Sequence, residues 1–293
     1  MQDQDYRRGL LAGVGAYFIW GLVPVYFKLL AGIGPVEVVA QRIGWSLVLL
    51  LGVLAVLGRL SALRPILADR RLLLSLTASA LLIAANWLIY IWAVVTGHLL
   101  AASLGYFLNP LLNVALGVLV LRERLSGGQK VAIALAGLGV AIAAAGALSQ
   151  IWVSVALAAS FGLYGLIRKQ APVGAIEGLA VETALLTPLC LGYLWWLSGH
   201  GGLGFGRDVT VSWLLVGSSV VTSLPLVMFA FAAKRLPYAT VGVLQYIAPS
   251  MVFLLGILAY GEALRPAMLA AFVLIWAGLI VFTRELVLGL KRT

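Results

Sequence analysis

Long apolar segments, each about as long as a membrane-spanning helix, recur along the whole chain between short polar or charged stretches. A helix that crosses the hydrocarbon core of a bilayer needs about 20 mostly apolar residues. The segments are apolar on nearly every face, whereas a transmembrane β-barrel would show short strands of alternating polarity. The pattern therefore predicts ten membrane-spanning helices. Their expected ranges are 9–28, 37–57, 72–96, 99–121, 129–148, 151–167, 178–197, 211–233, 238–260 and 267–287.

The composition agrees with a chain that lies almost entirely in a membrane. Of 293 residues, 63% are hydrophobic and 10% are charged, and the mean hydropathy is +1.09. These values lie far from those of water-soluble domains. Arg7 and Arg8 precede the first apolar stretch as in a secretory signal, but no small-residue cleavage site follows. We therefore expect an uncleaved first helix and an integral membrane protein with little room for a soluble domain.

The distribution of Lys and Arg predicts how the helices are oriented. Cytoplasmic loops of membrane proteins carry an excess of basic residues. With ten spans, nearly all the basic residues fall at the end of the bundle where the chain begins. Only Lys28, Arg207 and Arg265 fall at the opposite end, and Arg42 lies within a span. Both termini are therefore expected in the cytoplasm.

Several other classes of function are not expected. The formal net charge of +10 sits at helix ends, with no basic stripe interleaved with stacking aromatic residues, so nucleic-acid binding is not predicted. Cys190, His98 and His200 cannot assemble a disulfide framework or a metal site. No Walker motif and no cluster of nucleophile, acid and base is present, so we expect neither an enzyme nor a bound cofactor.

An internal repeat relates the two halves of the chain. Residues of the fourth span recur in the ninth, and residues of the first recur in the sixth, with displacements of 139 to 141. Five spans per half is an odd number, so the second half is expected to be inverted in the membrane. The predicted domains are residues 1–148 and 149–293. The matched positions are Pro110, Gly117, Glu123 and Leu125 with Pro249, Gly256, Glu262 and Leu264, and Trp20, Gly21, Lys28 and Glu37 with Phe161, Gly162, Lys169 and Glu177.

The start of the chain resembles a known family. The run from Tyr17 to Lys28 reads YFIWGLVPVYFK, and it is followed by Glu37 and by QRIGWS from Gln41 to Ser46. This pattern is similar to the opening of RarD-type proteins, which belong to the EamA group of the drug/metabolite transporter superfamily. The repeated helix that ends in Glu123 or Glu262 is similar to the EamA repeat.

The resemblance implies a ten-helix carrier of the bacterial inner membrane, built from two inverted repeats. Characterised members of the group export amino acids and related metabolites, and drugs in some cases. We therefore expect a secondary transporter for amino acids or related small metabolites, with broad specificity, that works by alternating access. The alternative is a channel-like passive facilitator of small polar solutes.

Two ionisable residues within predicted spans are the first candidates for a substrate site. A charge at mid-bilayer costs about 2.5–3.5 kcal/mol on insertion scales, so a chain keeps one there only with a partner or a water-filled cavity. Arg42 and Glu182 are separated by 140 residues and so occupy equivalent positions in the two repeats. One interpretation is that they line a central cavity and bind opposite ends of a zwitterion, or that Glu182 exchanges a proton. The others are a structural Arg42–Glu182 pair and snorkelling to an interface.

Polar and aromatic residues on several helices complete the predicted substrate site. They can hydrogen-bond an amino or carboxylate group, but polar bonding between packed helices explains them equally well. Trp20 is interpreted either as a cavity wall or as an interfacial anchor. The substrate-binding candidates besides Arg42 and Glu182 are Trp20, Asn86, Tyr90, Tyr106, Asn109, Tyr164, Gln245 and Tyr246, with Asn113 on the same face as Asn109.

Prolines inside spans are the predicted hinges, because the ring removes a backbone hydrogen bond. They are Pro24, Pro110, Pro225 and Pro249. Gly139 and Gly278, in the fifth and tenth spans, fit close helix packing instead. These two spans have few polar residues, and we expect them to be lipid-facing supports or the contact of a homodimer.

Overall fold

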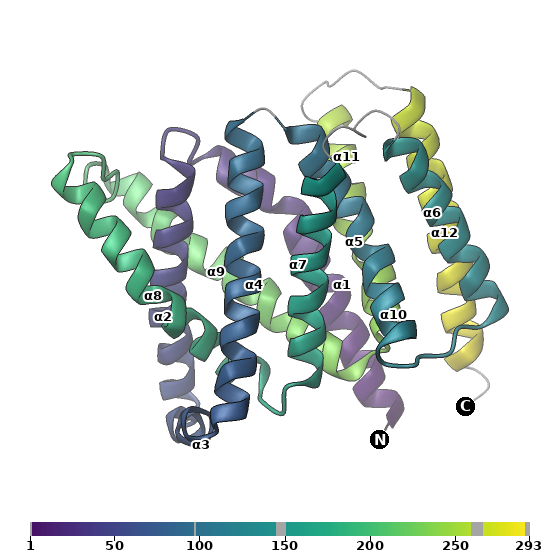
Figure 1. Cartoon of the computed structure of the whole chain (residues 1–293), viewed down its shortest axis with the longest axis horizontal. Helices are drawn as coiled ribbons and strands as arrows, with labels where there is room; N and C mark the ends of the chain where they lie inside the picture. Colours follow the sequence, from purple (N-terminus) through teal and green to yellow (C-terminus); the bar gives the residue numbers. More distant parts are fainter. Residues whose placement is uncertain (1, 97, 145–150, 259–265, 291–293) are drawn as a thin grey trace.

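The computed structural model describes residues 2–96, 98–144, 151–258 and 266–290, and all its long elements are helices (Figure 1). In this described part, nine helices are long and apolar enough to cross a membrane, and Leu104–Leu119 is a shorter apolar helix. The chain is therefore an all-α membrane protein. The elements are α1 (Gln2–Lys28), α2 (Pro35–Val56), η1 (Leu60–Ala62), α3 (Leu63–Ala68), α4 (Arg70–Val95), α5 (Leu99–Leu119), α6 (Gly127–Ala144), α7 (Ile151–Gln170), α8 (Ala175–Gly199), α9 (Val209–Arg235), α10 (Tyr238–Leu244), α11 (Ile247–Leu258) and α12 (Pro266–Leu290).

Within the described residues, each predicted range overlaps a helix or, for the ninth, the pair α10 and α11, and the expected ends at 148 and 260 lie outside those residues. Most ends differ by a few residues, but α1 begins at Gln2 because the charged residues before the apolar stretch continue the helix. The short helix α3 falls where only a loop was expected. Asp69 then starts α4 by accepting hydrogen bonds from the backbone N–H groups of Arg71 and Leu72.

The ninth predicted span is interrupted between α10 and α11, at Gln245 and Tyr246. Pro249 explains the interruption, because it has no N–H to donate to the carbonyl of Gln245 four residues earlier. That carbonyl instead accepts a 3.3 Å hydrogen bond from the N–H of Ala248. The other predicted hinges, Pro24, Pro110 and Pro225, lie inside continuous helices. The repeat partners Glu262 and Leu264 lie outside the described residues.

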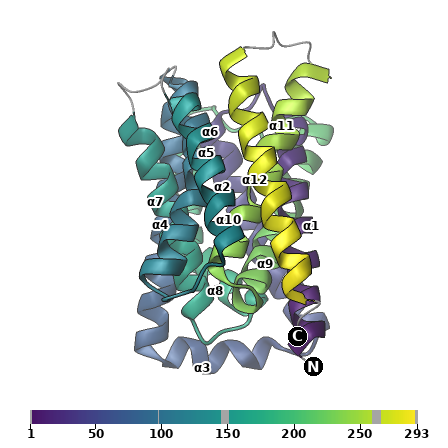
Figure 2. The ribbon, with the colours of Figure 1, turned by 90° about the vertical axis from the view of Figure 1, so that its right-hand side faces the viewer.

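The long helices form one bundle, with the first and last helices reaching the same end of it (Figures 1 and 2). α3 lies across this end of the bundle (Figure 2). α6 and α12 stand together at one side (Figure 1). The arrangement is consistent with termini on one side of a membrane.

Two glycines hold α6 and α12 close together. A Cβ on Gly139 would lie 2.6 Å from the carbonyl oxygen of Ala271, and a Cβ on Gly278 would lie 2.6 Å from that of Ala132. Only glycine permits such an approach between helix backbones. The packing role expected for these two glycines is therefore a close contact between α6 and α12. The homodimer contact stays a prediction.

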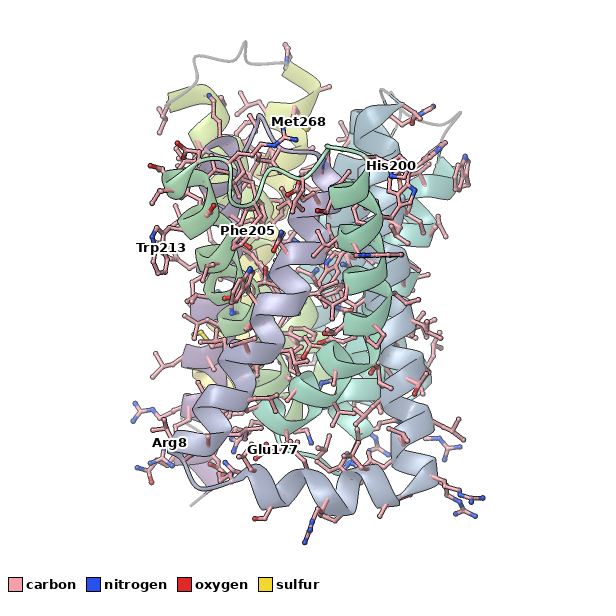
Figure 3. The ribbon with its side chains drawn as sticks, turned by 90° about the vertical axis from the view of Figure 1, so that its left-hand side faces the viewer. Arg8, Glu177, His200, Phe205, Trp213 and Met268 are labelled. Atoms are coloured by element: carbon pink, nitrogen blue, oxygen red, sulfur yellow. The ribbon has the colours of Figure 1, made fainter. Side chains whose placement is uncertain are left out.

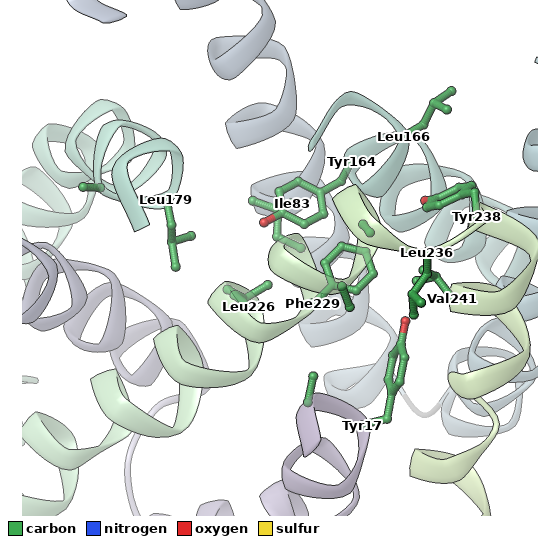
Figure 4. Packing of buried hydrophobic residues seen from close by; sticks show 14 of the residues in the cluster. Tyr17, Ile83, Tyr164, Leu166, Leu179, Leu226, Phe229, Leu236, Tyr238 and Val241 are labelled. Atoms are coloured by element: carbon green, nitrogen blue, oxygen red, sulfur yellow. The ribbon is translucent and has the colours of Figure 1, made fainter. Parts of the chain in front are cut away.

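An aromatic core joins the two halves of the chain (Figure 4). Tyr164 of α7 stacks on Phe229 of α9, with ring centroids 6.1 Å apart, and Tyr17 of α1 meets the same Phe229 edge-on at 6.3 Å. Tyr238 of α10 donates a 2.7 Å hydrogen bond to the carbonyl of Gly162. Because these rings come from four helices, the core fixes α1 and α10 against α7 and α9.

Candidate functional site

Arg42 lies near one end of the bundle, as the eighth residue of α2. Pro35 fits the first turn of this helix because its fixed φ suits a helix start, and α2 then runs to Val56. At about 1.5 Å of rise per residue, Arg42 lies about 10 Å along the helix from its start. Its side chain is partly buried.

Aromatic side chains surround the guanidinium group of Arg42. Its central carbon lies 4.2 Å from the ring centroid of Trp87 and 5.8 Å from that of Phe27. Tyr90, Tyr106 and Cys190 lie near enough to interact with its charge. Five helices therefore supply this set, which we name the Arg42 cluster. It comprises Phe27 of α1, Arg42 of α2, Trp87 and Tyr90 of α4, Tyr106 of α5 and Cys190 of α8.

The Arg42 cluster retains accessible surface, and none of the described carboxylates serves as its counter-ion. Tyr90 is 37% exposed and Tyr106 is 48% exposed, and their rings are in contact at 5.8 Å. Among the residues that the structure describes, no acidic side chain lies within 4 Å of Arg42. Its Nε is buried without a hydrogen-bond partner. A cation flanked by aromatic faces and lacking a carboxylate is suited to hold an anionic group.

Glu182 lies in a second, enclosed cluster. Its Oε1 is 3.6 Å from Nε of Arg168 and accepts a hydrogen bond from the hydroxyl of Ser79. The Tyr164 hydroxyl lies beside both charges. Arg168 is 0% exposed and Glu182 is 1% exposed. We name Ser79, Tyr164, Arg168 and Glu182 the Glu182 cluster; its two opposite charges compensate each other inside the bundle.

The Arg42–Glu182 pair considered from the sequence is not formed, because Glu182 pairs with Arg168. Glu182 is the eighth residue of α8, as Arg42 is of α2, but the two helices begin at opposite ends of the bundle. Figure 3 shows Glu177, near the start of α8, at the end where α3 lies, and His200, after its last residue, at the other. Equal distances from the helix starts therefore put the two charges at different depths.

The end of the bundle near the Glu182 cluster is tied together by basic side chains. Arg59 pairs with Glu177 at 2.7 Å. The ammonium group of Lys234 donates to the carbonyls of Ala171 and Val173, in the connection between α7 and α8. Arg168 also donates a 2.9 Å hydrogen bond to the carbonyl of Ala175 at the start of α8. These contacts close this end around the α7–α8 connection.

Of the other predicted site residues, several bond helices together and lie outside the Arg42 cluster. Asn86 donates to the carbonyl of Leu157 and to the hydroxyl of Ser160, at 2.9 and 3.0 Å. Asn113 donates to Oε1 of Gln245 at 2.9 Å. These contacts match the alternative interpretation, polar bonding between packed helices.

Three further candidates pack inside the bundle, two of them buried and Trp20 partly buried. Tyr246 is nearly fully buried and donates to the carbonyl of Phe107 at 3.3 Å. Trp20 packs against Phe161 and Phe229 in the aromatic core, with centroids 5.8 and 5.9 Å apart. Asn109 is buried, and its Oδ1 has no hydrogen-bond partner. Tyr90 and Tyr106 are thus the two candidates that adjoin Arg42.

Two important side chains were missed from the sequence, Arg168 and Trp87. Arg168 stands beside Lys169 at the end of an apolar run, so it was counted among the basic residues outside the membrane. Its spacing of four from Tyr164 places the two on one helix face and was the available signal. Trp87 is likewise three residues from Tyr90, on the same face of α4.

Comparisons with known proteins agree with this architecture. Residues 7–145 match the family model described as the EamA-like transporter family. One solved crystal structure superposes with a TM-score of 0.71 over 93% of this chain and 96% of its own, at 19% sequence identity. At that identity the likeness concerns the fold.

Curated bacterial proteins match over nearly the full length. An uncharacterised transporter of Pseudomonas aeruginosa is 46% identical over 100% of this chain and 98% of its own. The protein RarD of Streptomyces exfoliatus is 43% identical over 99% and 93%, and the protein RarD of Escherichia coli is 36% identical over 100% and 99%. The chain is therefore a multi-pass membrane transporter of the EamA family and is RarD-like.

Proposed function

We propose that the chain is a secondary carrier that exports amino acids or related small metabolites across the bacterial inner membrane by alternating access. In this proposal ten spans form two inverted repeats, residues 1–148 and 149–293, and the substrate binds at the Arg42 cluster. The observation that carries the proposal is a difference in accessibility between positions that the repeat makes equivalent.

Equivalent positions of the two halves differ in exposure. Tyr106 is 48% exposed, whereas Gln245, 139 residues later, is 6% exposed. Arg42 is partly exposed, whereas Glu182, 140 residues later, is 1% exposed. In an inverted repeat the two halves can exchange conformations, which would close the accessible set and open the buried one. In this proposal the structure represents one of the two states, the one in which the Arg42 cluster is exposed.

Reciprocal contacts between the halves support the inverted repeat. Gly139 meets Ala271 while Gly278 meets Ala132; Gly278 follows Gly139, and Ala271 follows Ala132, each by 139 residues. The equivalent residues Trp20 and Phe161 touch each other, with ring centroids 5.8 Å apart.

A second reciprocal pair lies at the helix starts. Glu37 of α2 accepts hydrogen bonds from the N–H groups of Gly204 and Phe205, in the connection after α8, at 2.9 to 3.1 Å. Glu177 of α8 binds Arg59, in the connection after α2. Each half thus anchors the loop that follows the second helix of the other half, as two-fold symmetry would require.

The cytoplasmic placement of both termini rests on the basic residues. Arg8 lies at the end of the bundle that α3 crosses (Figure 3). Arg64 within α3, and Arg59, Arg70 and Arg71 on either side of it, lie at the same end. Because cytoplasmic loops are rich in basic residues, this end faces the cytoplasm in the proposal, and the Arg42 cluster lies toward the opposite end.

Counterflow in proteoliposomes tests the proposal. Vesicles preloaded with an unlabelled amino acid should accumulate the same labelled amino acid transiently above equilibrium. The reason is that a carrier that has released unlabelled substrate outside can return with labelled substrate bound. A channel-like facilitator would only equilibrate the label. Failure of counterflow across a full amino-acid panel, with protein shown to be folded and inserted, would overturn the amino-acid carrier.

A further inference from the structure

Arg42 carries a buried charged group whose hydrogen bonding is incomplete, and no described acidic side chain pairs with it. Its Nε is buried without a hydrogen-bond partner, and one face of the guanidinium lies against the ring of Trp87. Desolvation of this charge is unfavourable unless an anion or water completes its hydrogen bonds. A negative charge beside Arg42 must come either from a described acidic side chain or from a bound ligand.

Four acidic side chains are already committed to backbone N–H groups. Asp69 and Asp208 cap the starts of α4 and α9. Glu37 binds the two N–H groups of the connection after α8, and Glu123 binds those of Tyr238 and Ala239 at the start of α10. Each carboxylate satisfies helix or loop donors that would otherwise lack a partner.

The other acidic side chains that the structure describes have side-chain partners. Asp5 pairs with Arg235, Glu177 with Arg59 and Glu182 with Arg168. Glu285 accepts a 2.6 Å hydrogen bond from the hydroxyl of Ser126. No described carboxylate is therefore left to receive the ammonium group of a zwitterion beside Arg42.

The chemistry of the Arg42 cluster favours a carboxylate on an apolar body. A guanidinium can bind the two oxygens of one carboxylate through parallel N–H groups while an aromatic ring covers its face. The rings of Phe27, Trp87, Tyr90 and Tyr106 offer apolar contact to the rest of the molecule. A single cation balances a single negative charge, so a phosphate dianion would remain undercompensated.

We propose that the Arg42 cluster selects organic monocarboxylates and that an amino group on the ligand is not required. Amino acids would then be one kind of ligand within a wider class that includes carboxylates without an amino group. This inference rests on the proposed carrier function for its physiological meaning, but ligand binding can be measured without transport.

Matched ligands test the inference on the purified full-length protein. Two series remove one group at a time: L-phenylalanine, 3-phenylpropionate and 2-phenylethylamine, and L-leucine, 4-methylpentanoate and 3-methylbutylamine. Inorganic phosphate is a further arm. Binding is read from the concentration-dependent rise of the melting temperature, because a ligand that binds only the folded state stabilises it. Arg42→Gln, Arg42→Lys and the exposed control Arg8→Ala are compared with the unaltered chain.

We expect the amino acid and its des-amino carboxylate to bind with similar affinity, and the amines and phosphate to bind far more weakly. Arg42→Gln should weaken carboxylate binding about ten- to hundredfold, given the usual strength of hydrogen bonds to charged groups. Arg42→Lys should recover part of it, and Arg8→Ala should change nothing.

The inference would be overturned if the des-amino carboxylates bound far more weakly than the amino acids. Two other kinds of result would also overturn it. One is that the amines or phosphate bind as tightly as the carboxylates. The other is that no carboxylate binds, or that carboxylates bind equally to folded Arg42→Gln protein. If carboxylates bind in an Arg42-dependent way but counterflow is absent, the proposed anion site stands and the proposed carrier function is wrong.

Discussion

Arg42 and Glu182 are each the eighth residue of their helix, in α2 and α8, which pack against each other and start at opposite ends of the bundle. Glu182 is enclosed with Arg168, whereas Arg42 has no acidic partner among the described residues. Equivalent positions of the two halves therefore differ: the charge of Glu182, toward the end where α3 lies, is compensated, and the charge of Arg42, toward the other end, has no described acidic partner. This asymmetry is the basis of the proposed transport cycle.

Glu182→Gln should destabilise the protein, because it leaves the buried guanidinium of Arg168 without its counter-charge. Removing one partner of a buried ion pair typically costs about 3–5 kcal/mol. Thermal unfolding in detergent would measure the loss. The double variant Arg168→Gln with Glu182→Gln should recover much of it. If Glu182→Gln alone were as stable as the unaltered chain, the pairing described here would be wrong.

Gly139→Ala should loosen the contact between α6 and α12. The added methyl group would lie 2.6 Å from the carbonyl oxygen of Ala271, so one backbone must shift. Overpacking of this kind typically costs about 1–3 kcal/mol. Gly137→Ala is the matched control on the same helix, since a Cβ there meets no atom within 4 Å. Equal melting temperatures for the two variants would contradict the close packing at Gly139.

Pro249→Ala should slow transport without lowering stability. The new N–H can donate to the carbonyl of Gln245 and make α10 and α11 continuous, which removes a point of bending. Pro24→Ala, inside the continuous helix α1, is the comparison. The measurement is the initial rate of counterflow at equal protein content. A rate unchanged in Pro249→Ala would show that the break does not serve as a hinge.

The helix ranges were predictable because a span must be apolar for about 20 residues, a property that each segment carries by itself. Pro249 gave a partial signal for the break at Gln245. The exact position of this break and the presence of the short helix α3 depend on local hydrogen bonds, which hydropathy does not show. The partner of Glu182 was not predictable, because it depends on which helices touch. Arg168 stands next to Lys169 at a helix end, and hydropathy cannot show that one of these cations turns into the bundle.

The sequence indicated which polar and aromatic residues were candidates for the site, but it did not indicate which of them are neighbours. Tyr90 and Tyr106 adjoin Arg42, while Asn86, Asn113 and Gln245 bond helices together. The same side-chain chemistry serves both purposes, so helix periodicity gives the face of a residue but not what lies opposite it. Trp87 shows the same limit: its contact with Arg42 depends on how α2 and α4 meet.

The most direct test of the account is the accessibility of two equivalent positions during transport. In a Cys190→Ser background, which removes the one cysteine, Tyr106→Cys and Gln245→Cys are probed from each side of the membrane with an impermeant thiol reagent. Without substrate, the cysteine at 106 should react from the side opposite the termini and that at 245 should be protected. With a transported substrate, reaction at 106 should fall while reaction at 245 from the side of the termini rises. Labelling that is unchanged by substrate at both positions, in protein that still transports, would contradict the exchange of conformations between the two halves.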